Sequence, residues 1–480
     1  MNTIHIEDLM NSSGVSFGTS GARGLVSQMT DGLCYAYCAA FLQSVPAHTT
    51  QVVLGHDLRP SSPKIAAACA SAIQDAGFEL IYAGALPTPA LAYHATQLNA
   101  PCIVVTGSHI PFDRNGLKFY LASGEITKLD ELLIKNASVS VPQNLNPTAL
   151  PIVDNHAHSS YIDRYVNFFG NSSLSGMRVA IYEHSSVARD LLCDILQVLG
   201  AEVISLGRTD TFVPIDTEAV RPEDIEQAKT WAATYQFDAI VSTDGDADRP
   251  LIGDEQGQWF RGDLVGILCA EFLQAQVVVT PVSSNTVVEK SKLFSKVIRT
   301  RIGSPYVIAG MEEIKVAGST SVVGYEANGG FLLGNDIKQN GKTLRALATR
   351  DAVLPILALL CMTRDKHCKL SELAAYLPAR FTYSNRLQQI STTTSSTLIA
   401  QFTLDLNEAV KYFAPNSGKV MHTDLVDGLR ITFGNGDIVH LRPSGNAPEL
   451  RCYAEADSQQ HAQVLCEQCL VRLASLAKEC

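Results

Sequence analysis

The chain has 480 residues, 46% of them hydrophobic and 18% charged, so it is long enough for three or four domains and too apolar to be disordered. Its net charge of −11 and its lack of a basic run argue against binding to nucleic acid, although local loops can still hold small anionic ligands. Residues 1–13 lack the pattern of a signal peptide, and no apolar run reaches the roughly 18–20 residues of a membrane-spanning helix. Twelve cysteines, mostly in apolar surroundings, fit a reducing compartment. We therefore expect a cytoplasmic protein without membrane contacts.

A pattern of buried strand, helix and buried strand occurs three times along the chain. The strand pairs are 52–54 with 80–82, 179–182 with 203–204, and 277–280 with 297–298. The helix of the first pair is predicted over 63–75, the helix of the second pair ends at residue 199, and the helix of the third pair is predicted over 285–293. Apolar strands that alternate with helices are typical of mostly parallel sheets covered on both faces. The sequence therefore predicts three related α/β domains in tandem.

The last hundred residues follow a different pattern. After Pro378, Thr- and Ser-rich alternating segments lead to a hairpin signal, in which the turn 434–437 joins strands 429–433 and 438–441, and to a helix over 458–477. A Pro- and Asn-rich linker at 141–153 and a turn at 254–257 mark two earlier boundaries. The prediction is an α/β chain with mixed, mostly parallel sheets and a C-terminal α+β domain, divided into domains 1–150, 151–256, 257–378 and 379–480.

One polar loop displays a serine directly after an apolar strand. Val104 and Val105 lead into the small, polar turn Thr106-Gly107-Ser108-His109. Ser108 could be a nucleophile if a base or a phosphoryl donor activated it. A serine that only caps a helix or stabilises a turn would give the same local sequence.

A second loop places three carboxylates at alternate positions after the strand 240–243. Asp244, Asp246 and Asp248 surround a glycine, and Arg249 and Pro250 follow. Carboxylates this close together repel one another unless a cation holds them, and Mg²⁺ is typically bound by a few carboxylates together with a phosphate oxygen. An EF-hand is the alternative, but Pro250 and the preceding strand argue against it. We predict a divalent metal site.

Three further segments are polar and rich in glycine. Residues 322–331 contain Glu326 and Asn328, a carboxylate and an amide suited to sugar hydroxyls. Residues 440–449 combine Arg442, Ser444, Gly445 and Asn446 in a pattern that is typical of a phosphate-binding nest. Residues 17–25 form a glycine-rich loop with Arg23 but without the lysine of a P-loop. Each of them could also be a structural turn.

Taken together, the five segments resemble the α-D-phosphohexomutase family, which includes bacterial phosphomannomutases and phosphoglucomutases. FGTSGARG, VTGSHIP, DGDADR, GYEANGG and RPSGNAPE occur in the order and at about the spacing of that family, over nearly the whole chain. The segment at 55–61, GHDLRPS, resembles another family segment. The resemblance implies four domains around a central cleft, the first three with a shared α/β core.

The resemblance also implies a role for each matching residue. Ser108 matches the serine that is phosphorylated in the active form and that contacts Mg²⁺, and the three aspartates match the other metal ligands. The remaining matches are basic or acid–base groups beside the serine (Arg23, His109, Lys118, Arg249), sugar-binding groups (Glu326, Asn328) and phosphate-binding groups (Arg442, Ser444, Gly445, Asn446). Arg301 matches a substrate-contacting basic residue only loosely.

The activity implied is the interconversion of hexose 6-phosphate and hexose 1-phosphate, most often of mannose and also of glucose. The family works through a phosphoserine and a hexose 1,6-bisphosphate, which is both intermediate and activator. Substrates would be small sugar phosphates, and the chain would be a monomer or a homodimer. A phosphohexosamine mutase, a catalytically silent sugar-phosphate binder and a phosphatase are the alternatives.

The chain departs from the family pattern at three loops. Gly107 and Ile110 stand where alanine and asparagine are common, and Asn446-Ala447 replaces Thr-Glu. In the sugar loop, Asn328 replaces serine, and Gly330 stands where relatives commonly have a histidine that is a candidate general acid or base. His109, Lys118 or Arg23 would have to take over that role, and the preferred epimer stays open.

Overall fold

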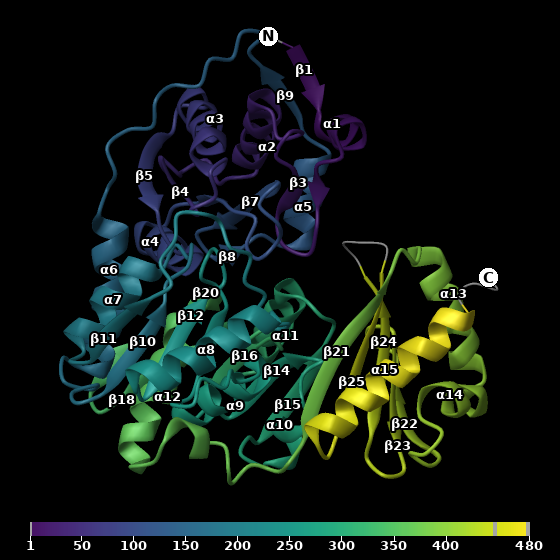
Figure 1. Ribbon diagram of the computed structural model, residues 1–480. Helices are drawn as coiled ribbons and strands as arrows, with labels where there is room; N and C mark the ends of the chain where they lie inside the picture. Colours follow the sequence, from purple (N-terminus) through teal and green to yellow (C-terminus); the bar gives the residue numbers. More distant parts are fainter. Residues whose placement is uncertain (1, 445–448, 477–480) are drawn as a thin grey trace. The chain divides into compact units, whose positions relative to one another are not determined.

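The computed structural model describes residues 2–444 and 449–476. It divides into two compact units (Figure 1): unit 1 consists of residues 1–275 and 311–375, and unit 2 of residues 276–310 and 376–480. Among the described residues, no helix is both long and apolar enough to cross a membrane.

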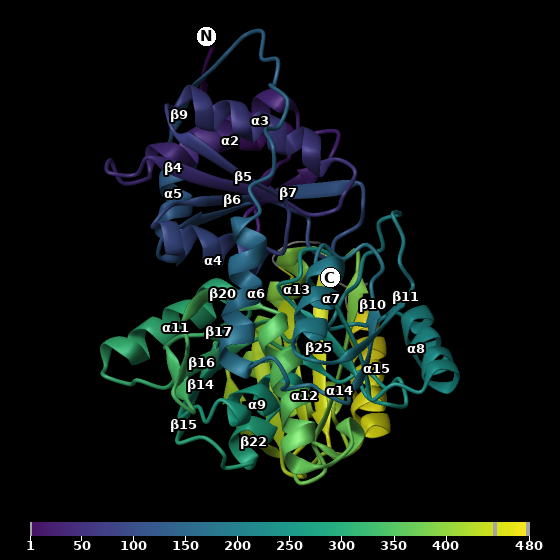
Figure 2. The same cartoon turned by 90° about the vertical axis from the view of Figure 1, so that its left-hand side faces the viewer.

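Unit 1 begins with a mixed sheet of strand order β2-β3-β7-β6-β4-β5, in which β4 runs parallel to both β5 and β6. Figure 2 shows helices α2 and α3 on one face of this sheet and α4 on the other. Val52, Val53 and Leu54 of β4 are completely buried, as expected for a strand covered on both faces. The elements are β1 (Asn2–His5), α1 (Ile6–Ser13), β2 (Ser16–Phe17), β3 (Ala22–Leu25), α2 (Asp31–Gln43), β4 (Gln51–His56), α3 (Ser62–Asp75), β5 (Glu79–Ala85), α4 (Thr88–Leu98), β6 (Cys102–Val105), β7 (Arg114–Leu121), β8 (Gly124–Glu125), α5 (Lys128–Lys135) and β9 (Ser138–Val141).

The second sheet has the order β11-β10-β12-β13, with β10 parallel to β11 and β12 and with β13 antiparallel. The strand β12 is buried along its whole length, and the turn that follows β13 is fixed by Asp254, whose carboxylate accepts the N–H groups of Gln256 and Gln258. The elements are α6 (His156–Phe169), β10 (Arg178–Tyr182), α7 (Arg189–Val198), β11 (Glu202–Leu206), α8 (Pro222–Tyr235), β12 (Ala239–Thr243) and β13 (Pro250–Gly253).

The third strand–helix–strand segment has a shorter helix than the sequence indicated. The helix predicted over 285–293 is limited to Val287–Lys290, because Lys292 takes a left-handed backbone conformation with φ 56°. Strands β14 and β15 are parallel, and β17 pairs antiparallel with both β16 and β20. The elements are α9 (Gly262–Phe272), β14 (Val277–Pro281), α10 (Val287–Lys290), β15 (Lys296–Thr300), α11 (Ser304–Val316), β16 (Val322–Tyr325), β17 (Phe331–Leu333), β18 (Ile337–Gln339), β19 (Lys342–Leu344), β20 (Leu347–Asp351), α12 (Val353–Lys366) and the 3-10 helix η1 (Leu370–Glu372).

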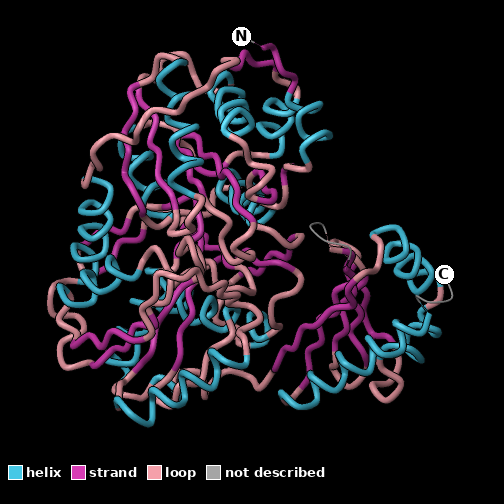
Figure 3. Tube along the Cα trace, turned by 45° about the horizontal axis from the view of Figure 1, so that its top comes forward, coloured by secondary structure: helices cyan, strands magenta, loops and turns pink. Residues whose placement is uncertain are grey.

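The C-terminal part of unit 2 is an antiparallel sheet of order β21-β25-β24-β23-β22 that packs against helices (Figure 3). The predicted hairpin is confirmed, since Leu429 pairs with Leu441 across the turn at 434–437. Cys466 and Cys469 lie buried in the last helix, against this sheet. The elements are β21 (Phe381–Gln388), α13 (Thr392–Leu404), α14 (Leu406–Phe413), β22 (Val420–Asp424), β23 (Leu429–Phe433), β24 (Ile438–Pro443), β25 (Glu449–Ala456) and α15 (Gln459–Leu476). The predicted fold class is confirmed; the predicted domain limits stay a prediction.

Candidate active site

Three loops of unit 1 meet at one buried cluster of charged side chains. Ser108 follows β6, Asp244 to Asp248 follow β12, and Glu326 follows β16. The Oγ atom of Ser108 lies 2.6 Å from Oδ2 of Asp244. Arg350 on β20 joins the second and third loops. Residues that are far apart in the sequence are thus brought into direct contact.

Ser108 is held in an unusual backbone conformation. Its φ of 53° lies in the left-handed region, and the residue is only 1% exposed. The side-chain oxygen of Thr106 accepts the N–H of Ser108 at 2.8 Å. A non-glycine residue in this region costs of order 1 kcal/mol, and such strain persists where the surrounding structure enforces it. The strained turn aims the Ser108 hydroxyl at Asp244.

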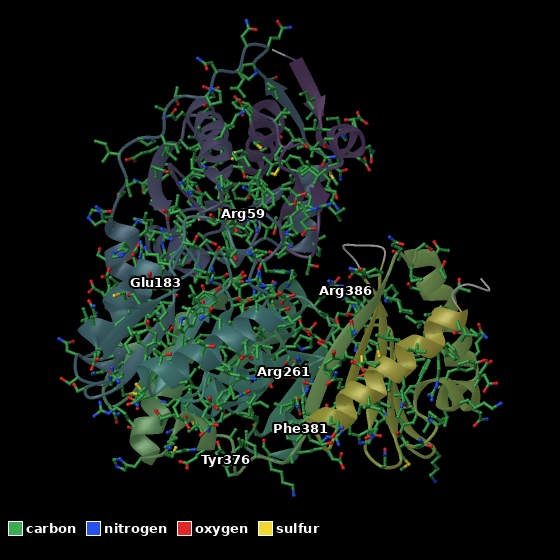
Figure 4. The ribbon with its side chains drawn as sticks, viewed as in Figure 1. Arg59, Glu183, Arg261, Tyr376, Phe381 and Arg386 are labelled. Atoms are coloured by element: carbon green, nitrogen blue, oxygen red, sulfur yellow. The ribbon has the colours of Figure 1, made fainter. Side chains whose placement is uncertain are left out.

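Arg59 fixes the serine loop from beneath and was not singled out from the sequence. Its guanidinium forms an ion pair with Asp57 and lies 4.0 Å from the ring centroid of Phe212. It donates hydrogen bonds to the carbonyl oxygens of Ser108, Ile110, Pro111 and Arg114. Figure 4 labels its position. A Cβ at Gly107 would lie 2.6 Å from this guanidinium, which explains glycine at that position. The sequence feature that could have pointed to Arg59 is the resemblance of residues 55–61 to a family segment.

Replacing Arg59 by lysine should loosen the loop without removing the charge. An ammonium cannot reach four carbonyl groups at once, so Ser108 should lose its fixed position. We expect kcat to fall about 10²-fold with little change in KM, because small misplacements of reacting groups cost that much. Arg189→Lys is the matched control, since Arg189 also donates to backbone carbonyls, those of His184 and Thr209. Steady-state kinetics showing equal effects of both substitutions would contradict this role.

The three aspartates form a set of oxygen atoms suited to a hard cation. One carboxylate oxygen from each of Asp244, Asp246 and Asp248 lies within 4.8 Å of the others, and all three residues are buried. Oδ1 of Asp246 and Oδ1 of Asp248 are buried without a hydrogen-bond partner. Burial and the two neighbouring carboxylates raise the pKa of Asp244 well above its usual range. Oxygen atoms that accept no hydrogen bond in a buried carboxylate cluster fit a divalent metal ion.

Four basic side chains surround the aspartates. Nζ of Lys118 lies 2.6 Å from Asp246 and 2.7 Å from Asp248, and Arg350 lies 2.7 Å from Asp248. Burial lowers the pKa of Lys118, but the two aspartates outweigh it, so the pKa is raised and the ammonium stays charged. Burial and then Arg249 lower the pKa of Arg23 to about 10. The cluster can therefore attract a multiply charged anion such as a phosphate group.

His109 is neutral in this surrounding. Burial and the charge of Arg249 lower the pKa of His109 well below its ordinary value. A guanidinium can only donate, and Nη1 of Arg249 lies 2.8 Å from Nδ1 of His109, so Nδ1 accepts and the ring proton resides on Nε2. Its basic nitrogen is thus already occupied. His109 is suited to donate a hydrogen bond from Nε2 rather than to take up a proton.

The loop after β16 is held by its own side chains. Glu326 forms an ion pair with Arg350 at 2.8 Å, and the side-chain oxygen of Asn328 accepts the N–H of Gly330 at 2.9 Å. A Cβ at Gly330 would lie 2.7 Å from Cδ of Arg350. The space beside this glycine is therefore filled by Arg350, a residue that sequence reasoning missed. No local pattern marks Arg350, because its role depends on how β20 pairs with β17.

Unit 2 brings two predicted basic residues to one turn. Nε of Arg301 donates to the carbonyl oxygen of Val426, and Nε of Arg442 lies 2.9 Å from Oδ2 of Asp427. The same Asp427 oxygen accepts the N–H of Ile302 at 2.9 Å. Ser444 follows Arg442 by two positions in the sequence and is buried. Gly445 and Asn446 lie outside the described residues. The loosely matched Arg301 thus shares its anchoring turn with Arg442.

Replacing Arg442 by methionine should weaken substrate binding if this arginine holds a phosphate. Loss of charge-assisted hydrogen bonds should raise KM about 10- to 100-fold. Arg472→Met on α15 is the control, because Nη1 of Arg472 donates to a backbone oxygen, that of Tyr412. An unchanged KM in the Arg442 variant would remove this residue from the substrate site.

The arrangement, a buried serine hydroxyl beside three carboxylates and several basic side chains, suits the class of phosphoryl-transfer enzymes. The chain matches the four domain profiles of the phosphoglucomutase/phosphomannomutase family: alpha/beta/alpha domain I over residues 14–139, domain II over 159–257, domain III over 261–381 and the C-terminal domain over 405–470.

Full-length relatives agree with these matches. The chain is 50% identical over 477 residues to a phosphomannomutase of Salmonella muenchen, covering 99% of this chain and 98% of that protein. It is 43% identical to a phosphomannomutase of Sinorhizobium fredii over 96% of this chain and 99% of that protein. The fold is similar to that of a phosphoglucomutase/phosphomannomutase family protein from Burkholderia thailandensis, with a TM-score of 0.75 at 20% identity over 96% and 97% of the two chains. The chain belongs to the α-D-phosphohexomutase family.

Proposed function

We propose that the protein interconverts hexose 6-phosphate and hexose 1-phosphate, with mannose as the preferred sugar and glucose as a second substrate. The observation that supports this most is the Ser108 hydroxyl, 2.6 Å from Asp244 in a buried cluster of aspartates and basic side chains. The two phosphomannomutase relatives support mannose. Buried thiols at most described cysteines support a reducing, cytoplasmic location.

Ser108 would carry the phosphoryl group between two sugar hydroxyls. In the first step, the bond between phosphorus and Oγ of phosphorylated Ser108 breaks while a free sugar hydroxyl bonds to phosphorus, and the proton of that hydroxyl ends on Oγ of Ser108. The resulting hexose 1,6-bisphosphate, which is also the activator, would reorient within the site so that its other phosphoryl group faces Ser108. In the second step, the bond between its other phosphorus and the sugar oxygen breaks while that phosphorus bonds to Oγ of Ser108, and the Oγ proton ends on the released sugar oxygen. Positioning and neutralisation of charge supply most of the rate enhancement in such transfers.

The residues around Ser108 would divide the remaining tasks. Asp244, Asp246 and Asp248 would hold Mg²⁺, which would neutralise charge on the transferring group when bound. Lys118, Arg249, Arg23 and Nε2–H of His109 would contact the phosphoryl oxygens. Arg442 and Arg301, with Ser444, would hold the phosphate that does not react, and Glu326 would contact the sugar. Because Glu326 is paired with Arg350, the position of Arg350 would also influence which sugar is accepted.

A substrate panel tests this proposal. We expect the highest kcat/KM with mannose phosphate, a lower value with glucose phosphate and the lowest with glucosamine phosphate, all with hexose 1,6-bisphosphate and Mg²⁺ present. Relatives at 28% identity include a phosphoglucosamine mutase of Pelobacter propionicus, so a higher value with glucosamine phosphate would favour that activity instead. Release of inorganic phosphate in excess of isomer would indicate a phosphatase.

A further inference from the structure

A polar pocket lies in unit 1, outside the active-site cluster. It has a volume of about 210 Å³ and is lined by residues of α4 and α6 and by Thr343 and Arg345 of the β19 segment. None of the residues that line it belongs to the serine loop, the aspartate loop or the sugar loop. The pocket is therefore separate from the proposed chemistry.

Arg164 of α6 contributes a buried positive charge to the pocket. This residue is 5% exposed, and none of its three guanidinium nitrogens has a hydrogen-bond partner among the described residues. Its guanidinium carbon lies 4.8 Å from the ring centroid of Tyr93 and 5.5 Å from that of Tyr165. Burying a charge that makes no hydrogen bonds costs free energy. A guanidinium held against aromatic rings keeps its N–H groups available to donate to a planar or tetrahedral oxyanion. Arg164 therefore points to an anionic ligand.

The other polar groups of the pocket fit a ligand with several oxygen atoms. Gln97 and Asn167 offer amide N–H groups, and Thr343 offers a hydroxyl. Arg345 lies 3.0 Å from Asp336 and is already paired. Asp163 also lines the pocket, but its carboxylate is exposed and therefore screened by solvent. Burial lowers the pKa of Arg164, but Tyr165 and Asp351 raise it more, so the guanidinium is charged. Neutral donors around a charged guanidinium whose nitrogens lack well-formed hydrogen bonds suit phosphate better than a single carboxylate, because phosphate presents more acceptor oxygens.

We propose that this pocket binds a small phosphate monoester through Arg164. The volume accommodates a phosphate group together with a small organic part, since one water takes about 30 Å³ of the liquid. The proposal is independent of the mutase assignment, and each can fail without the other.

The pocket also contacts elements that end in the active site. Tyr161 and Tyr165, on either side of Arg164 along α6, both donate hydrogen bonds to the carboxylate of Asp351. Asp351 follows Arg350, which contacts Asp248. A ligand that fixes α6 against β19 should therefore also reduce the motion of β20.

Hydrogen–deuterium exchange of the full chain, with inorganic phosphate as the probe, tests the proposal. We expect phosphate to slow exchange in residues 156–169 and 342–346. Arg164→Met should raise the phosphate concentration needed for that protection about tenfold or more. Asn167→Asp should also weaken it, because it places a negative charge at the pocket while its exposed side chain leaves the core intact. Gln227→Glu, the same amide-to-carboxylate change on the exposed face of α8, should have no effect.

Three outcomes would overturn the proposal. Protection absent from these segments in the wild type would show that phosphate does not bind there. Protection that persists unchanged in both variants would show that phosphate binds elsewhere. If Arg164→Met does not fold, unchanged protection in Asn167→Asp would show the same. Equal protection by acetate at the same ionic strength would show a site for any anion rather than for phosphate.

Discussion

Replacing Ser108 by alanine is expected to reduce mutase turnover by a factor of about 10⁴ or more. The substitution removes the only atom of that residue that can bond to phosphorus, and loss of a covalent nucleophile has effects of this size or larger. Stability should change by only about 1 kcal/mol, because the strained backbone is retained while one hydrogen bond to Asp244 is lost. The measurement is isomer formation from mannose 1-phosphate with hexose 1,6-bisphosphate and Mg²⁺ present.

The control for this experiment is another buried serine. Ser395→Ala in α13 removes a fully buried hydroxyl that has no hydrogen-bond partner among the described residues. It should leave turnover near the wild-type value. Turnover of the Ser108 variant within about tenfold of wild type, with mannose and glucose phosphates alike, would mean that another group accepts the phosphoryl group.

Replacing Asp248 by asparagine is expected to have the second largest effect. Asp248 is completely buried and contacts both Lys118 and Arg350 at 2.7 Å, so its loss removes a proposed metal ligand and leaves two buried cations with one carboxylate fewer. We expect turnover to fall about 10³-fold, the Mg²⁺ concentration for half-maximal activity to rise, and the free energy of unfolding to drop by about 3 kcal/mol. A Mg²⁺ titration of activity and a denaturant titration measure the two effects.

Asp254→Asn separates the metal role from a purely structural one. Asp254 is also buried, and its carboxylate accepts two backbone N–H groups in the turn after β13. This variant should lose about 1 kcal/mol of stability without any change in its Mg²⁺ dependence. If Asp248→Asn lost stability but kept the wild-type Mg²⁺ midpoint, the aspartate loop would be structural only.

The sequence predicts those features that are local in the chain. The strands at 52–54 and 179–182 are apolar runs, and the hairpin at 429–441 combines alternating strands with a glycine-rich turn, so each is encoded within 13 residues or fewer. Ser108 and the three aspartates are likewise marked by their position directly after apolar strands. The helix expected over 285–293 was too long because the left-handed conformation of Lys292 has no clear signal in its neighbours.

The contacts that were missed depend on strand order. Thr88, at the start of α4, donates to Asp246 at 2.8 Å, although 158 positions separate them. Arg350 meets Asp248 and Glu326 only because β20 lies beside β17. Arg59 reaches the serine loop because β4 and β6 are neighbours in the sheet. Such partners follow from the tertiary arrangement of the strands, which hydrophobic periodicity does not specify.

The most direct test of the central claim is to locate the phosphoryl group on the protein. The purified chain should be incubated with hexose 1,6-bisphosphate and Mg²⁺, digested, and analysed by mass spectrometry for phosphopeptides. The account predicts a single phosphorylated site at Ser108, which is lost when excess mannose 6-phosphate is added and is absent from the alanine variant. A phosphate found on another residue, or a phosphorylated Ser108 that excess sugar phosphate does not discharge, would contradict it.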